Sequence, residues 1–271
     1  MPPRPITFLS DYGTEDEFAG ICRAVIARIA PDARVIDLAH GIPRHAVDRG
    51  AAVLAAALPY APAGIHLAVV DPGVGSPRRA VAARVSVEER VLVGPDNGLL
   101  WPAVERLGGA VEAVDVSLSA FRLEPISATF HGRDVFAPVA AHLARGAPLS
   151  EAGEPIAADS LARLERGEPS IEPGRVTATV VSVDRFGNAA LDLADRHLPE
   201  TGLRLGRRLT VEVPGAVHDA VFALTFADVA TGALILYRDS SDSLALALNR
   251  GSAAEALELE PGGEVILRPA G

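Results

Sequence analysis

Two hydrophobic patterns follow one another along this chain of 271 residues. Up to residue 150, short apolar runs alternate with stretches of helical periodicity, which is typical of an α/β domain with a mainly parallel sheet. Prolines at positions 31 and 59 indicate where two of the helices end. The predicted strands are 6–9, 34–38, 65–70 and 91–93, and the predicted helices are 15–30, 46–58, 99–107 and 134–144.

Beyond residue 174 the hydrophobic period changes to two, which is typical of short strands in an antiparallel barrel or sandwich. The strands with this pattern are "RVTATVVSV", "RLTVEV", "ALILYR", "SLALAL" and "EVILR". Residues 158–174 separate the two patterns and hold charges, two prolines and two glycines. We therefore predict an N-terminal α/β domain over 1–160, a linker over 161–173 and a small antiparallel β-barrel-like C-terminal domain over 174–271.

Composition narrows the classes of function. A hydrophobic content of 49% indicates a folded core, and a formal net charge of −10 argues against nucleic acid or an anionic membrane as a partner. Cys22 is the only cysteine and no lysine is present, so an intrachain disulfide, a thiolate zinc cluster, a Walker lysine and a Schiff-base lysine are excluded. The most apolar region is interrupted by Pro59 and Pro62, so we expect a cytoplasmic protein.

Two aspartates directly follow predicted strands of the parallel sheet. Asp11 follows "ITFLS" and Asp71 follows "IHLAVV", so both should project from the same sheet edge, where such sheets bind ligands. "SDYGTEDEFAG" has two interpretations: a helix cap with acids near the positive end of the dipole, or an Asp11 carboxylate that holds a ribose diol. Acids at this helix start would repel a pyrophosphate, which favours a neutral or cationic nucleoside.

Three further N-terminal motifs are ambiguous. "DPGVGSPRRA" is either a tight turn or a loop that returns Arg78 toward Asp71, and "GPDNG" is typical of a turn. In "TFHGRDVFAP", His131 and Asp134 suit a metal ligand pair, a base with an orienting acid, or a helix start. Metal binding is disfavoured because no second histidine lies at ligand spacing.

One C-terminal motif goes beyond what a barrel requires. In "SVDRFGNAALDL", Asp184 and Asn188 flank Phe186, an arrangement that can stack an aromatic ring on a base while an amide contacts the edge of that base. "LTFADV" adds Phe226. Each of these stretches is also compatible with a simple turn.

Seven motifs in order, "SDYGTEDEFAG", "DPGVGSPRRA", "GPDNG", "TFHGRDVFAP", "DRFGN", "TFAD" and "ALNRGSAA", resemble those of the S-adenosyl-L-methionine (SAM) hydroxide adenosyltransferases. These are SAM hydrolases related to the fluorinase and the chlorinase, and the resemblance covers nearly the whole chain. It implies an α/β domain followed by a β domain, a homotrimer, and SAM bound between one subunit's N-terminal domain and its neighbour's C-terminal domain.

The resemblance also implies residue roles. Asp71, Arg78 and His131 match the residues that surround the attacking water, whereas the halogenating relatives carry tyrosine at the positions of Asp71 and His131. The substrate-binding positions are Asp11 and Asp16 near the ribose, Phe186, Asn188, Phe226 and Arg250 at the adenine, and Asp184 and Ser240 at the methionine end. The stretch "SSDSLALAL" departs from the family pattern at Asp242, Ser243 and Ala245.

The predicted function is hydrolysis of SAM to adenosine and L-methionine by attack of water on the ribose 5′ carbon. No metal or cofactor is expected, since SAM is the substrate and its sulfonium leaves as a neutral thioether. Three alternatives stay open: a chlorinase-like enzyme that uses halide, a SAM- or adenosine-binding protein without turnover, and a metal-dependent hydrolase that chelation would inactivate. Residue types alone leave open whether His131 or Asp71 takes the proton.

Overall fold

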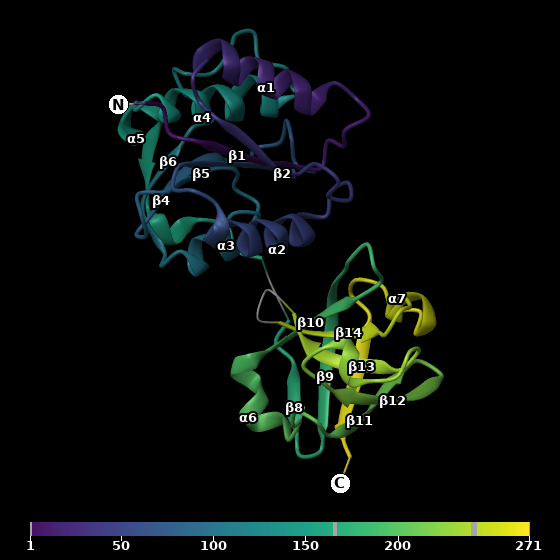
Figure 1. Ribbon diagram of the computed structural model, residues 1–271. Helices are drawn as coiled ribbons and strands as arrows, with labels where there is room; N and C mark the ends of the chain where they lie inside the picture. The colour runs from purple at the N-terminus through teal and green to yellow at the C-terminus, as the bar shows by residue number, and fades with distance from the viewer. Residues whose placement is uncertain (1, 165–166, 240–242, 271) are drawn as a thin grey trace. The chain divides into compact units, whose positions relative to one another are not determined.

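The computed structural model describes residues 2–164, 167–239 and 243–270. The chain divides into two compact units, Met1–Leu164 and Glu165–Gly271 (Figure 1). Within the described ranges, no helix is both long enough and apolar enough to cross a membrane.

A seven-stranded sheet forms the centre of the first unit, in the order β2-β1-β3-β5-β4-β6-β7. The pairs β2–β1, β1–β3 and β3–β5 are parallel, whereas β4 is antiparallel to both β5 and β6, and β7 is antiparallel to β6. Five strands therefore run in one direction, which confirms the mainly parallel sheet. The strands are β1 (Ile6–Ser10), β2 (Val35–Ala39), β3 (Ile65–Val69), β4 (Ala80–Val85), β5 (Val91–Pro95), β6 (Ala110–Asp115) and β7 (Glu154–Ile156).

Helices cover both faces of this sheet (Figure 1). One face packs against α1 and α4 in a core that includes Phe8, Ile26 and Leu143; the other packs against α2 and α3 around Leu54 and Leu92. Burial from both sides explains why the central strands are continuous apolar runs. The helical segments are α1 (Phe18–Ile29), α2 (Val47–Ala57), η1 (Leu58–Tyr60), α3 (Trp101–Arg106), η2 (Gly132–Phe136), α4 (Ala137–Ala144), α5 (Leu149–Ala152) and η3 (Ala158–Ser160).

Two details differ from the sequence predictions. The first helix begins at Phe18 rather than at residue 15, so Glu15, Asp16 and Glu17 precede it and no acidic residue lies in its first turn. The helix predicted from Asp134 begins earlier, as the π-helical turn η2, and continues as α4.

The second unit is a β-barrel. Strand β9 pairs with β15 on one side and with β10 on the other, and β10 pairs with β14, which closes seven strands into a ring with β8 added outside β9. One barrel pair, β12–β13, is parallel and the remaining barrel pairs are antiparallel. The strands are β8 (Ser170–Glu172), β9 (Arg175–Val183), β10 (Ala189–Ala194), β11 (Arg208–Val213), β12 (Ala216–Phe222), β13 (Leu234–Arg238), β14 (Ser243–Leu248) and β15 (Glu264–Pro269).

The period of two is visible in β9, where buried and half-buried residues alternate along all nine positions. Its inward side chains join a barrel core that includes Val180, Leu191, Leu246 and Leu267. Short helical turns connect the strands: η4 (Asp195–His197), α6 (Leu198–Thr201), η5 (Phe226–Asp228) and α7 (Ala253–Ala256).

The segment predicted as the linker contains ordered contacts at both ends. Leu161 and Leu164 pack on the core of the first unit, and Ala162 N–H donates to Asp96 Oδ1 at 2.7 Å. At the other end, Ser170–Glu172 forms β8 and pairs with β9.

Candidate active site

The expectation that Asp11 and Asp71 share one sheet edge is confirmed. Strands β1 and β3 lie side by side with Ser10 opposite Val69, and the Asp11 N–H donates to the Val69 carbonyl at 3.3 Å. Asp71 follows β3 after one further residue. The two carboxylates lie close enough for the Asp71 charge to raise the pKa of Asp11, although burial is the larger cause of that rise.

Arg78 binds Asp71 through two parallel bonds. Its Nε donates to Asp71 Oδ1 at 2.9 Å and its Nη2 to Asp71 Oδ2. The loop between them folds back through a bond from Val74 N–H to the Asp71 carbonyl, and the Arg78 guanidinium lies 5.3 Å from the centre of the Phe136 ring. Both charged side chains are nearly enclosed, 6% exposed for Asp71 and 11% for Arg78, so solvent screens their attraction only weakly. The interpretation of this loop as one that returns Arg78 to Asp71 is therefore confirmed.

His131 contacts the same guanidinium. Its Nδ1 lies 3.0 Å from Arg78 Nη2, and the residue precedes the π-helical turn η2. Burial lowers the pKa of His131, the Arg78 charge lowers it further, and the charges of Asp71 and Asp134 only partly oppose this. This shift favours the neutral form of the ring at pH 7.

Asp134 serves the loop and not the histidine. Its carboxylate, 2% exposed, accepts from Arg133 Nε at 2.6 Å and from the Ser127 N–H at 2.8 Å. It therefore fixes the segment that leads into His131. Asp134 is therefore not the orienting acid of His131, whose ring contacts Arg78 instead.

The "GPDNG" turn supports the strand end beside the site. Asn97 Nδ2 donates to the Val70 carbonyl at 2.9 Å, directly before Asp71, and Asn97 Oδ1 accepts from Leu99 N–H at 3.2 Å. Asp96 instead pairs with Arg79. The expected turn thus also stabilises the end of β3 before Asp71. The sequence did not indicate this role, because Asp-Asn-Gly is common in turns.

Asp11 has one further partner that sequence reasoning missed. The backbone N–H of His45 donates to Asp11 Oδ2 at 3.2 Å, and His45 holds a left-handed conformation with φ of 66°. Such a conformation is unfavourable for a residue with a Cβ and occurs often at functional sites. Asp16, the second predicted ribose contact, is exposed between β1 and α1.

Tyr12 was also missed. A Cβ on Gly132 would collide with the Tyr12 hydroxyl, so the glycine beside His131 allows that hydroxyl to approach. Burial raises the pKa of Tyr12 well above its usual value, and the Asp11 and Asp71 carboxylates raise it further against the opposing charge of Arg78. The site therefore contains a hydroxyl that stays protonated, and a tyrosine in a turn motif gives no sequence signal of that role.

Three of the six predicted binding residues of the second unit lie in one turn. Asp184 Oδ1 accepts from the N–H groups of Phe186 and Asn188 at 2.8 and 2.9 Å, and its Oδ2 accepts from Asn188 Nδ2 at 2.8 Å. The hydrogen bond between the Asp184 carboxylate and the Asn188 amide thus closes the turn. The Phe186 ring is left 67% exposed, with the Arg185 guanidinium 5.2 Å from its centre.

Tyr237 connects this turn with Phe226. The rings of Phe226 and Tyr237 lie 5.3 Å apart, and burial together with the charges of Asp184 and Asp239 raises the pKa of Tyr237 to about 12. Its position in an alternating strand concealed it in the sequence. Arg250 is exposed with φ of 63°, and Ser240 lies outside the described residues.

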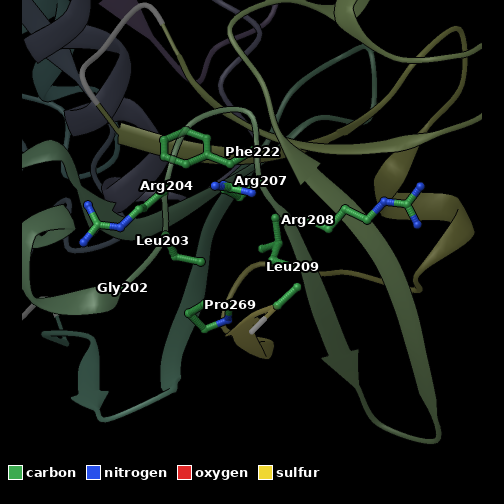
Figure 2. Close-up of a pocket in the computed structure, with 9 residues that line it drawn as sticks. Gly202, Leu203, Arg204, Arg207, Arg208, Leu209, Phe222 and Pro269 are labelled. Atoms are coloured by element: carbon green, nitrogen blue, oxygen red, sulfur yellow. The ribbon is translucent and has the colours of Figure 1, made fainter.

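A cavity of about 290 Å³ opens in the second unit away from these residues, next to β11 and the end of β15. Its walls include Leu203, Phe222 and three arginines. Figure 2 shows the Arg204 and Arg208 side chains pointing in different directions, so their charges do not converge on one position in it. Among the described residues, no group of three or more His, Cys, Asp or Glu side chains is arranged to hold a metal ion.

Comparison with known proteins accounts for both units. The family model of the SAM hydroxide adenosyltransferase N-terminal domain matches residues 6–153, and that of the C-terminal domain matches residues 178–266. The chain belongs to the SAM hydroxide adenosyltransferase family. The resemblance drawn from seven ordered motifs is thereby confirmed.

Individual members of this family and its neighbours show the range of similarity. An (R)-S-adenosyl-L-methionine hydrolase of Salinispora tropica is 47% identical over 263 residues, 97% of each chain. A crystal structure of an uncharacterized conserved protein from Thermotoga maritima superposes with a TM-score of 0.89 at 34% identity, over 97% of this chain and 99% of that one. A fluorinase of Nocardia brasiliensis is more distant, 28% identical over 286 residues, 96% of this chain and 95% of the fluorinase.

Proposed function

We propose that this SAM hydroxide adenosyltransferase hydrolyses SAM to adenosine and L-methionine, with Asp71, Arg78 and His131 around the attacking water. The observation that carries the proposal is the contact series Asp71–Arg78–His131 at the ligand-binding edge of the sheet. The relatives named as hydrolases, up to 47% identical, support the same reaction.

The reaction is an in-line displacement at the ribose 5′ carbon. The water oxygen forms a bond to that carbon as the carbon–sulfur bond breaks, and the sulfur keeps the electron pair and leaves as the thioether of methionine. One proton of the water must go to the protein. Since the sulfonium needs no protonation, alignment and removal of that proton are the catalytic tasks.

The hydrogen bonds of Arg78 favour Asp71 as the proton acceptor. A guanidinium has only donors, so the His131 Nδ1 that faces it accepts, and the neutral ring then bears its proton on Nε2. In this tautomer His131 can donate to the water oxygen but cannot take its proton. The Asp71 oxygens keep free lone pairs after binding Arg78, so the proton goes to this carboxylate.

The binding residues divide between the two units. On the first, Asp11 takes the ribose diol, with Asp16 nearby; on the second, Phe186, Asn188, Phe226 and Arg250 frame the adenine, and Asp184 and Ser240 meet the methionine end. As the family resemblance implies, we propose a homotrimer in which each site combines the first unit of one subunit with the second unit of its neighbour. Loss of activity on dilution to monomers is the expected result.

A halide-using enzyme is the nearest alternative. A halide would have to approach the Asp71 carboxylate, whose charge repels it, whereas water benefits from an acceptor at the same place. A binding protein without turnover would not need an enclosed Asp71–Arg78 ion pair in contact with a histidine.

The deciding experiment incubates metal-free protein with SAM in chloride buffer made with ¹⁸O water. Adenosine with the label in its 5′-hydroxyl, plus unlabelled methionine, is the expected result by mass spectrometry. Chlorinated adenosine would establish the halide enzyme, intact bound SAM would establish a binding protein, and activity that appears only when metal is restored would establish a metal-dependent hydrolase.

A further inference from the structure

A line of hydrogen bonds runs from the protein surface to the backbone beside Asp11. Ser10 Oγ lies 2.7 Å from His40 Nδ1, and His40 Nε2 lies 2.9 Å from Asp37 Oδ1. The other oxygen of Asp37 accepts from Arg23 Nη1 at 2.5 Å. Of these residues, only Ser10 lies in a motif that the sequence analysis considered.

The chemistry of each group sets the direction of these bonds. A carboxylate only accepts, so His40 Nε2 donates to Asp37 Oδ1, and a ring with its single proton on Nε2 accepts from the Ser10 hydroxyl at Nδ1. The Ser10 oxygen in turn accepts from the Tyr12 N–H at 3.3 Å, and the His40 carbonyl accepts from the Gly13 N–H at 2.8 Å. The two residues that follow Asp11 are thus both tied to this line.

A serine, a histidine and an aspartate that are hydrogen-bonded in series also form a hydrolase triad, but the burial of Ser10 rules out that role. The serine is 0% exposed and His40 is 7% exposed, so no substrate reaches the hydroxyl. A buried polar network that is fully bonded makes one local arrangement rigid. The residue enclosed by this arrangement is Asp11, between Ser10 and Tyr12.

We propose that Ser10, His40 and Asp37 are positioning residues that aim the Asp11 carboxylate at the ribose diol of the substrate. This inference rests on the proposed function, in which Asp11 holds that diol. The line fixes the backbone on both sides of Asp11, and the His45 N–H fixes one carboxylate oxygen, so that both oxygens face the ligand without reorganisation.

The same strand provides a matched control. Thr7 Oγ1 lies 2.9 Å from Nδ1 of His66, a buried hydroxyl–imidazole pair like that of Ser10 and His40. Thr7 and Ser10 both lie on β1, and both side chains are buried. Only the Ser10 pair adjoins the site, so Thr7→Val reports what the loss of such a bond does to the fold alone.

The test compares the dissociation constants of adenosine and 2′,3′-dideoxyadenosine by calorimetry, with the full-length chain. In the wild type the dideoxyadenosine constant divided by the adenosine constant measures the contribution of the diol. Ser10→Ala should raise the adenosine constant roughly 3- to 10-fold, as loss of one buried hydrogen bond does, and leave the dideoxyadenosine constant unchanged. Thr7→Val should leave the ratio at its wild-type value.

The other outcomes also decide the matter. A ratio that is unchanged in Ser10→Ala, whether or not both ligands bind more weakly, would overturn the positioning role. Should Ser10→Ala not fold, Asp37→Ala changes a half-exposed end of the same line and must lower the ratio in the same direction. A wild type that binds adenosine with the expected ratio but leaves SAM intact would refute the proposed function alone.

Discussion

The two groups of proposed functional residues are built in opposite ways. In the first unit, Asp71, Arg78 and His131 come from two segments of the chain and meet at a sheet edge, although the last two are 53 positions apart. In the second, Asp184 and Asn188 bond each other within one five-residue turn. The geometry of the first group depends on the packing of the α/β core, whereas that of the second group is fixed by hydrogen bonds within its own turn.

That difference matches the chemistry each group is proposed to perform. Proton transfer and in-line attack tolerate little displacement, so residues fixed by strand ends and a buried ion pair suit them. Stacking of an adenine on an exposed ring tolerates more. Substitutions in the first unit should therefore reduce turnover, and those in the second should reduce affinity.

The largest effect is expected from Asp71→Asn, which keeps the shape of the side chain but removes the proposed proton acceptor. It should lower kcat/KM by about 10³-fold, within the range for loss of a general base. Asp96→Asn is the matched control, because Asp96 pairs with the neighbouring Arg79 away from the site. Steady-state kinetics that show equal losses in both variants would remove Asp71 from the mechanism.

Acid should lower the stability of the first unit through protonation of His66. Burial and the Arg90 charge lower the pKa of His66 to about 3, against about 6.5 in the unfolded chain. The folded state binds fewer protons, so stability is full above pH 6.5 and falls by about 1.4 kcal/mol per pH unit below it, a loss on the order of 3 kcal/mol by pH 4.

Denaturant unfolding between pH 4 and 7 measures this loss. The double variant Thr7→Val/His66→Leu replaces both hydrogen-bonding partners with apolar groups and should flatten the pH dependence. An unchanged slope in that variant would assign the acid sensitivity to other groups.

Arg78→Lys should lower kcat/KM by about 100-fold, because a single ammonium cannot hold Asp71 through two parallel bonds and also contact His131. Arg79→Lys makes the same exchange one position along, where the guanidinium binds Asp96 and Ser160. Full activity in Arg78→Lys would show that the two parallel hydrogen bonds to Asp71 are not needed.

The smallest effect is expected from Phe186→Ala in the second unit. Loss of a stacking surface for adenine should raise KM roughly 10-fold and leave kcat within about twofold. The ring is 67% exposed, so the fold should not change, which thermal unfolding can verify. A large drop in kcat would contradict the division between turnover and affinity.

Strand ends were more predictable than contacts between loops. The positions of Asp11 and Asp71 followed from apolar runs that end in an acid, because parallel strands place such residues at one edge. Strands β4 and β6 were not identified: three of the six residues of β4 are alanine, which does not favour strands. The acids expected in the first turn of α1 precede it instead, because tertiary contacts set where a helix begins.

The amino-acid sequence by itself determined the two kinds of layer and the family, since hydrophobic period and motif order are local properties of the chain. Only the tertiary structure decided that His131 faces Arg78 and not Asp134, that Ser10 joins His40, and that β9 and β10 close the barrel. Hydrogen-bond partners distant in the chain depend on strand register and loop closure, and these are settled only when the cores pack.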